Sequence, residues 1–104
     1  MIKNSTSQDI DVFSKAIVTL AKDAASTVSG VKLVSERRSR EAVKVSFLQN
    51  QKVQVDMIIS IALGNSVPTT VAALQDVVKS HIEGATKFNV NSVNVHVSSV
   101  DAEQ

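Results

Sequence analysis

Hydrophobic residues in the first third of the chain recur every three or four positions, which is the spacing of one face of a helix. They are Phe13, Ile17, Leu20, Ala24 and Val28, and further alanines widen the stripe. The spacing predicts a helix over residues 10–28. Ser7, Asp9 or Asp11 would cap its start, and Gly30 is a candidate stop.

The next third of the chain changes to the alternation of β-strands. A short strand is predicted over residues 31–35, a second over 42–48 and a third over 53–63. The charged segment 36–41 joins the first two strands, and residues 49–52 fit a hairpin loop.

The two faces of the third predicted strand differ in polarity. One face is apolar and is expected to be core: Val53, Val55, Met57, Ile59, Ile61 and Leu63. The other carries Ile58 among polar and small residues: Gln54, Asp56, Ser60 and Ala62. This second face is expected to be either solvated or a docking surface. Asp56 is expected to be exposed or paired across strands.

The last third predicts a helix and a final strand. Apolar positions repeat at helical spacing over residues 67–85, and residues 90–100 alternate with Asn94, His96 and Ser98 on the polar side. The predicted order is therefore α-β-β-β-α-β. One-sided helices and strands predict a two-layer α/β domain, with both helices packed on one face of a mixed sheet.

Composition narrows the class of protein. A chain of 104 residues is expected to form one domain over residues 10–100, between a flexible segment 1–9 and a polar tail 101–104. Hydrophobic residues make up 43% but aromatic residues only 3%, so the core has to be mainly aliphatic. The formal net charge of +1 does not indicate an obligatory nucleic-acid or anionic-lipid partner.

The chain contains no cysteine, which excludes disulfides, thiolate metal sites and cysteine nucleophiles. No signal-peptide pattern is present, and no apolar run reaches the roughly 18 residues of a membrane span. A cytoplasmic protein is therefore expected.

The segment ALGNSVPTTV, residues 62–71, raises the question of a phosphate site, because a strand passes through a glycine turn into a helix. A P-loop requires Lys followed by Ser or Thr, and a dinucleotide fingerprint requires three spaced glycines. This turn has one glycine and no basic residue. A sharp exit at Gly64, a cap at Ser66 or Val67, and Pro68 in the first helical turn explain it without a ligand.

Arg37, Arg38 and Arg40 form the one basic cluster. Arginines on a loop suit phosphates and carboxylates. The flanking residues are glutamates, however, and no aromatic residue is near in sequence to stack on a base. A solvated loop is favoured, and an RNA-binding domain using residues 37–44, including Lys44, is the weaker hypothesis.

No constellation of catalytic residues is apparent. His81 and His96 lack a His, Cys or carboxylate at metal-ligand spacing, and both are expected to be structural or surface residues. No Ser, His and acid grouping can be argued either. The prediction is a protein that is not an enzyme, with no catalytic, metal or cofactor site.

Four segments spanning nearly the whole chain carry a family pattern. They are LAKDAASTVSGV (20–31), VKVSFLQNQKVQVDMIISIALGNSVP (43–68), VAALQDVVKSHIEGATKF (71–88) and VNSVNVHVSSV (90–100). The more specific pieces are Gly30-Val31, Val55-Asp56, Gly64 with Pro68, and Val93-Asn94-Val95. Taken in order, these segments resemble the alkaline shock protein family, the Gls-type envelope stress response proteins of Gram-positive bacteria.

The chain departs from that family at three places. Leu63 replaces an aromatic residue, Thr69 replaces an acidic residue, and Lys87 stands where a glycine usually closes the second helix. Glycine supplies a left-handed cap, which Lys adopts at a cost of about 1 kcal/mol. The second helix is therefore expected to end differently, near Gly84 or Asn89.

The resemblance implies a non-enzymatic cytoplasmic protein that supports envelope homeostasis, held at the inner face of the membrane by a separate anchor protein. Its expected partners are that anchor or other family members, with self-association. Some relatives are encoded beside fatty-acid kinase or acetyl-CoA carboxylase genes, so a small regulatory partner of lipid-metabolism enzymes is the alternative. The residues expected to bind a partner are Ile58, Asn94, His96, Arg37, Arg38 and Arg40.

Overall fold

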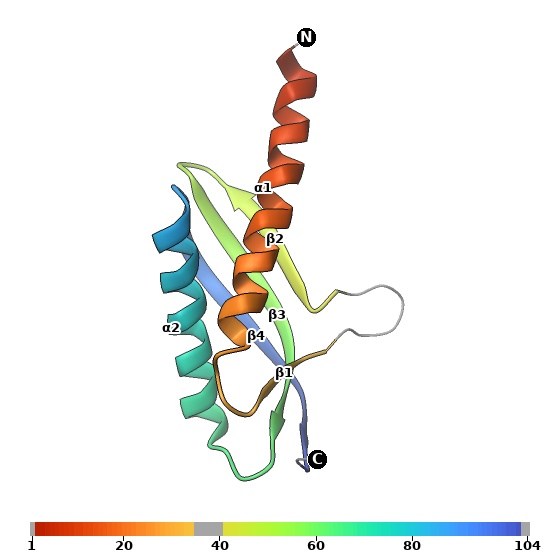
Figure 1. The fold of residues 1–104 in the computed structure, drawn as a ribbon, viewed down its shortest axis with the longest axis vertical. Coiled ribbons are helices and arrows are strands. Elements are labelled where there is room, and N and C mark those ends of the chain that lie inside the picture. Colours follow the sequence, from red (N-terminus) through yellow and green to blue (C-terminus); the bar gives the residue numbers. More distant parts are fainter. Residues whose placement is uncertain (1, 35–40, 103–104) are drawn as a thin grey trace.

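A computed structural model describes residues 2–34 and 41–102, with side chains in the first helix described from Val12 onward. The elements are α1 (Ile2–Ala25), β1 (Val31–Leu33), β2 (Val43–Leu48), β3 (Lys52–Ala62), α2 (Val67–Ala85) and β4 (Asn89–Asp101). This α-β-β-β-α-β order confirms the predicted fold class (Figure 1).

The long strand β3 organises the sheet because it pairs with all three other strands. β4 runs parallel to it along its whole length, from Lys52↔Asn89 to Ala62↔Asp101. β2 and β1 are antiparallel to it and follow one another along its other side, opposite residues 52–57 and 59–61. The helical crossover through α2 is what allows β3 and β4 to lie parallel.

Both helices pack on one face of the sheet and enclose the core (Figure 1). β3 turns alternate side chains into this layer, as its sequence predicts, and α1 and α2 contribute apolar stripes. The large side chains that are fully buried are Ile17, Met57, Ile59, Ile61, Leu74, Ile82, Val43, Val53, Val55 and Val78.

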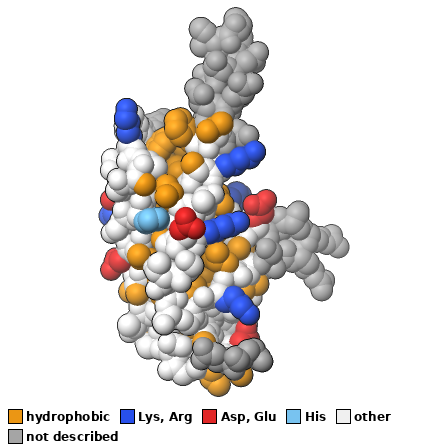
Figure 2. Space-filling model, in the orientation of Figure 1, with side chains coloured by type: hydrophobic (Ala, Val, Ile, Leu, Met, Phe, Trp, Pro, Cys, Tyr) orange, Lys and Arg blue, Asp and Glu red, His pale blue; other side chains and the backbone are white. Residues whose placement is uncertain are grey.

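The three phenylalanines of the chain form one cluster at an end of this core. The ring of Phe88, which follows α2, lies 5.5 Å from Phe13 of α1 and 5.4 Å from Phe47 of β2, edge to face in both cases. Figure 2 shows hydrophobic side chains at the surface in the upper part of the molecule, where the described side chains of α1 begin. The cluster joins three segments that are distant in sequence.

The first helix begins at Ile2 rather than at residue 10, so a start near Ser7, Asp9 or Asp11 is wrong. Residues 2–25 contain neither glycine nor proline to interrupt the helix. Gly30 is not its stop either. The helix ends at Ala25, and the Thr27 hydroxyl donates to the carbonyl of Ala24 (2.7 Å) in the turn that follows.

Gly30 has a different role, in the turn that leads into β1. Its φ is +84°, and an added Cβ would lie 2.8 Å from Nδ2 of Asn65. The Asn65 side chain in turn donates to the carbonyl of Ala62 (2.9 Å). Glycine is therefore required both by the backbone conformation and by the close approach of the turn after β3.

Leu63 does not belong to the core, which corrects the prediction for the end of the third strand. β3 ends at Ala62, and Leu63 is 65% exposed. The cause is the turn at Gly64, whose φ of +100° takes the chain out of the sheet. Ser66 then caps α2 by accepting a hydrogen bond from the backbone N–H of Thr69 (3.4 Å), as the predicted helix start requires.

The second helix ends at Ala85, next to the predicted Gly84, and does so without a left-handed cap. Thr86 has an extended backbone (φ −137°, ψ 175°), and both its N–H and its hydroxyl donate to the carbonyl of Ile82. The same hydroxyl accepts from the N–H of Phe88 (3.1 Å). Because Thr86 satisfies the end of the helix, Lys87 does not need a positive φ.

Candidate functional site

The sheet face opposite the helices is the candidate site, and we call it the outer sheet face. It consists of the side chains that alternate away from the core. The residues that matter below are Lys44 of β2, Asp56 and Ile58 of β3, and Asn94 and His96 of β4.

The pairing of β3 with β4 brings the sequence-predicted residues together. Ile58 lies directly opposite His96, and Asp56 lies opposite Asn94. The Asn94 amide donates to Oδ1 of Asp56 (2.9 Å), which confirms that Asp56 pairs across strands. Three of the six residues expected to bind a partner, Ile58, Asn94 and His96, are thus neighbours on one face.

Ile58 is held rigidly at the junction between β1 and β2. Its N–H donates to the carbonyl of Ala42 (2.9 Å), and its carbonyl accepts from the N–H of Val34 (3.0 Å). Its side chain is half-buried, unlike that of Ile59, which is fully buried on the other face. A half-exposed aliphatic side chain on a fixed backbone can contact a partner without a large loss of conformational entropy.

Lys44 extends the polar row, although the sequence did not predict it as part of this face. It lies opposite Asp56 on the side away from Asn94, so Lys44, Asp56 and Asn94 cross three strands in one line. The signal was available, because Val43 and Val45 alternate toward the core and leave Lys44 outside. The sequence did not predict the register between β2 and β3, which places Lys44 opposite Asp56.

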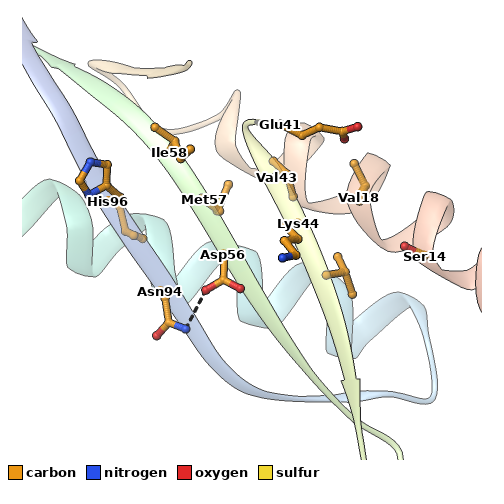
Figure 3. Close-up of a pocket in the computed structure, with 12 residues that line it drawn as sticks. Ser14, Val18, Glu41, Val43, Lys44, Asp56, Met57, Ile58, Asn94 and His96 are labelled. Carbon is orange, nitrogen blue, oxygen red and sulfur yellow. Dashed lines mark hydrogen bonds between the residues drawn. The ribbon is translucent and has the colours of Figure 1, made fainter. Parts of the chain in front are cut away.

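A surface depression of about 1010 Å³ includes these residues in its lining (Figure 3). Asp56, Ile58, Asn94 and His96 line it on the outer sheet face, and Ser14 and Val18 of α1 line it on the helix side, so the depression extends beyond the outer sheet face. Its lining combines two separate carboxylates, an ammonium group, an amide and several aliphatic side chains. Such a mixed, open surface suits a reversible protein contact rather than an enclosed small-molecule site.

The remaining predicted partner residues, Arg37, Arg38 and Arg40, lie outside the described residues, so their role stays a prediction. His81 is exposed on α2, away from the outer sheet face. Within residues 2–34 and 41–102, no three His, Asp or Glu side chains gather in a way that would hold a metal ion. On the helix side of the molecule, acidic and basic side chains are interspersed (Figure 2).

Comparison with known proteins places this arrangement in a family. Residues 2–102 match the family described as "Asp23 family, cell envelope-related function". No curated protein sequence matches the chain significantly.

Solved structures share the fold. A variant of "MamM CTD" in a zinc form has a TM-score of 0.54 and 21% identity, and the match covers 86% of this chain and 87% of that one. A second MamM CTD variant has a TM-score of 0.52 and 20% identity, over 82% of this chain and 95% of that one. At this identity the similarity shows a common fold and nothing about ligands.

Proposed function

Because the chain belongs to the alkaline shock protein 23 family, which has a cell envelope-related function, we propose that it is a non-enzymatic docking protein. It binds partner proteins through the outer sheet face and supports envelope homeostasis. The observation that supports this most directly is the position of Ile58. It is an aliphatic side chain among polar neighbours, on a sheet face that neither helix covers.

The contribution of the contact to the binding free energy can be estimated from the Ile58 side chain. Removing an Ile from water contributes on the order of 1.5–3 kcal/mol, which is roughly a tenfold to hundredfold change in affinity. The surrounding Lys44, Asp56 and Asn94 supply charges and amide groups that orient a partner. A contact of this kind gives moderate, reversible binding.

Attachment to the membrane is proposed to occur through a separate anchor protein. No helix in the described part of the chain combines the length and apolarity needed to cross a bilayer. The formal net charge of +1 provides little attraction to anionic lipid headgroups. A protein partner in the membrane therefore accounts best for a role at the envelope.

The substitution Ile58→Glu is expected to lower binding to membranes by about ten- to a hundredfold. The measurement is cosedimentation of the purified protein with inverted membrane vesicles prepared from the source organism. Protease treatment of those vesicles should abolish binding of the unsubstituted protein, because the anchor is a protein.

Leu63→Glu is the matched control, since it places the same charge on an exposed aliphatic residue outside the outer sheet face. It should bind like the unsubstituted protein. Equal loss in both variants, or full binding to protein-free lipid vesicles, would contradict docking through Ile58.

Purified protein is expected to contain no stoichiometric metal and to show no nucleotide hydrolysis. The described residues contain no cluster of His, Asp and Glu with metal-ligand geometry, and the chain has no cysteine ligand. Elemental analysis after dialysis against zinc is the measurement, because a structural neighbour exists in a zinc form. One zinc per chain would overturn the non-enzymatic, metal-free proposal.

A further inference from the structure

Among residues 2–34 and 41–102, β4 pairs with β3 alone, so its other side is a free edge of the sheet in the described part of the chain. Successive residues in a strand point their backbone groups alternately to its two sides. The N–H of Asn89 donates to Gln51 (2.9 Å) and the carbonyl of Asp101 accepts from Leu63 (2.7 Å), so these two residues face β3. The extra residues at the two shifts of register, Asn91 and Ser98, each move the alternation by one position, so residues 93, 95 and 97 face away from β3 although Asn89 and Asp101 face toward it. The backbone groups that point to the free edge belong to Val90, Val93, Val95, Val97 and Val100.

The first part of this edge is already occupied by side chains of α2. The carboxylate of Glu83 accepts from the N–H of Val90 (2.8 Å), and the amide of Gln75 donates to the carbonyl of Val93 (2.9 Å). Side chains that bond to an edge in this way prevent another strand from pairing there. This protection stops at Val93.

The next part of the edge is unprotected. The N–H and C=O groups of Val95 and Val97 on this side have no partner within the described part of the chain. β4 has no charged side chain before Asp101, whereas β1 and β2 carry Lys32 and Lys44. Monomeric proteins commonly blunt an edge strand with such charges, so an uncharged, half-protected edge favours pairing with another strand.

We propose that this edge pairs with the same segment of a second copy of the chain. The two β4 strands run antiparallel about a two-fold axis at His96, which places Val95 of each copy opposite Val97 of the other. Each such pair exchanges two backbone hydrogen bonds, and the axis generates the pair twice. The half-buried Val95 and Val97 side chains then also meet across the interface.

A second copy of the chain fits this edge better than a charged partner segment does. The segment offers no charged side chain for such a partner, while its own copy supplies the same uncharged backbone and valines. The formal net charge of +1 gives two copies little repulsion. The exposed residues in the first turns of α2 are short, so no long side chain there obstructs a second copy: Pro68, Thr69, Ala72 and Ala73.

This inference extends the proposed function, since a docking protein that also pairs through β4 would present two outer sheet faces side by side. The two surfaces share His96 but use different groups, because docking uses side chains of the face and pairing uses the backbone of the edge. Ile58→Glu should therefore leave self-association intact, and a substitution at the β4 edge should leave monomer binding to the membrane vesicles intact. Failure of one proposal can thus be recognised separately from failure of the other.

Amide hydrogen exchange of the unsubstituted protein, resolved by residue with NMR, tests the pairing directly. Asn94 and His96 point their N–H groups to β3 and should be protected at every protein concentration. The amides of Val95 and Val97 should exchange rapidly in dilute solution and become protected as sedimentation shows a dimer forming. A monomer up to millimolar concentration, or a dimer without protection at these two amides, would overturn the proposal. So would protection that does not depend on concentration.

The substitution Val97→Pro removes one outward N–H per copy without removing a bond to β3. Loss of two hydrogen bonds per dimer should weaken self-association about thirtyfold. Val100→Pro is the matched control, because Val100 lies on the same edge beyond the irregularity at Ser98. It should dimerise normally. Continued protection of the Asn94 and His96 amides verifies folding in both variants, and equal loss of dimer in both would overturn the pairing at Val95 and Val97.

Discussion

Replacing Ile59 by Glu is expected to unfold the domain. Ile59 is fully buried in β3, between Leu33 of β1 and Val97 of β4. The substitution loses about 1.5–3 kcal/mol of burial and places a carboxyl group without a partner in the core, at a further cost of several kcal/mol. Because domains of this kind are stable by about 5–15 kcal/mol, most or all of the stability should be lost. Circular dichroism and thermal melting of the purified variant provide the measurement.

Ile58→Glu is the control for that result, since it introduces the same side chain one residue earlier on the opposite face. Ile58 is only half-buried, and a carboxylate there can reach water. We expect a loss of about 1 kcal/mol, or a fall in Tm of about 4–8 °C. If Ile58→Glu unfolds the protein as completely as Ile59→Glu, the outer sheet face is internal and cannot be a docking surface.

Phe88→Ala should produce the second largest effect, a loss of about 2–3 kcal/mol in the free energy of unfolding. Phe88 is half-buried, so this loss is smaller than for a fully buried ring. It is nevertheless the central ring of the cluster, in edge-to-face contact with both Phe13 and Phe47. Urea unfolding followed by circular dichroism measures the change, with the m-value checked for two-state behaviour.

The comparison with Phe13→Ala makes this prediction specific. Phe13 is 47% exposed and contacts Phe88 without contacting Phe47 in a ring pair, so its loss should cost about 1 kcal/mol. In a double-mutant cycle, the two substitutions should be less than additive, since each removes the same ring contact. A loss for Phe13→Ala that equals or exceeds the loss for Phe88→Ala would show that the cluster does not centre on Phe88.

Local patterns in the sequence determined the type and the order of the elements. The helical spacing over residues 67–85 and the alternation in residues 53–61 identify α2 and β3 with their buried faces, because each element must bury one face. The same alternation is sufficient to place Ile58 and Ile59 on opposite faces of β3. The absence of a phosphate motif followed in the same way from residue types at fixed spacings.

Element ends were less well determined, because they depend on turns and caps that compete locally. Leu63 continues the alternation of β3 but leaves the sheet at Gly64, and α1 continues to Ile2 through three residues that are able to cap a helix. Thr86 replaces the missing glycine at the end of α2. In each case one hydrogen bond or one backbone angle determines where the element ends. The apolar pattern of the sequence does not contain that information.

Only the tertiary structure decided which elements meet. The row of Lys44, Asp56 and Asn94, the cluster of three phenylalanines, and the protection of β4 by Gln75 and Glu83 all join residues that are distant in sequence. Strand register and helix placement arise from packing the whole core at once, so no local window of sequence encodes them. The sequence by itself therefore determined which side chains leave the core, whereas the fold decided which of them became neighbours and which edge of the sheet stayed free.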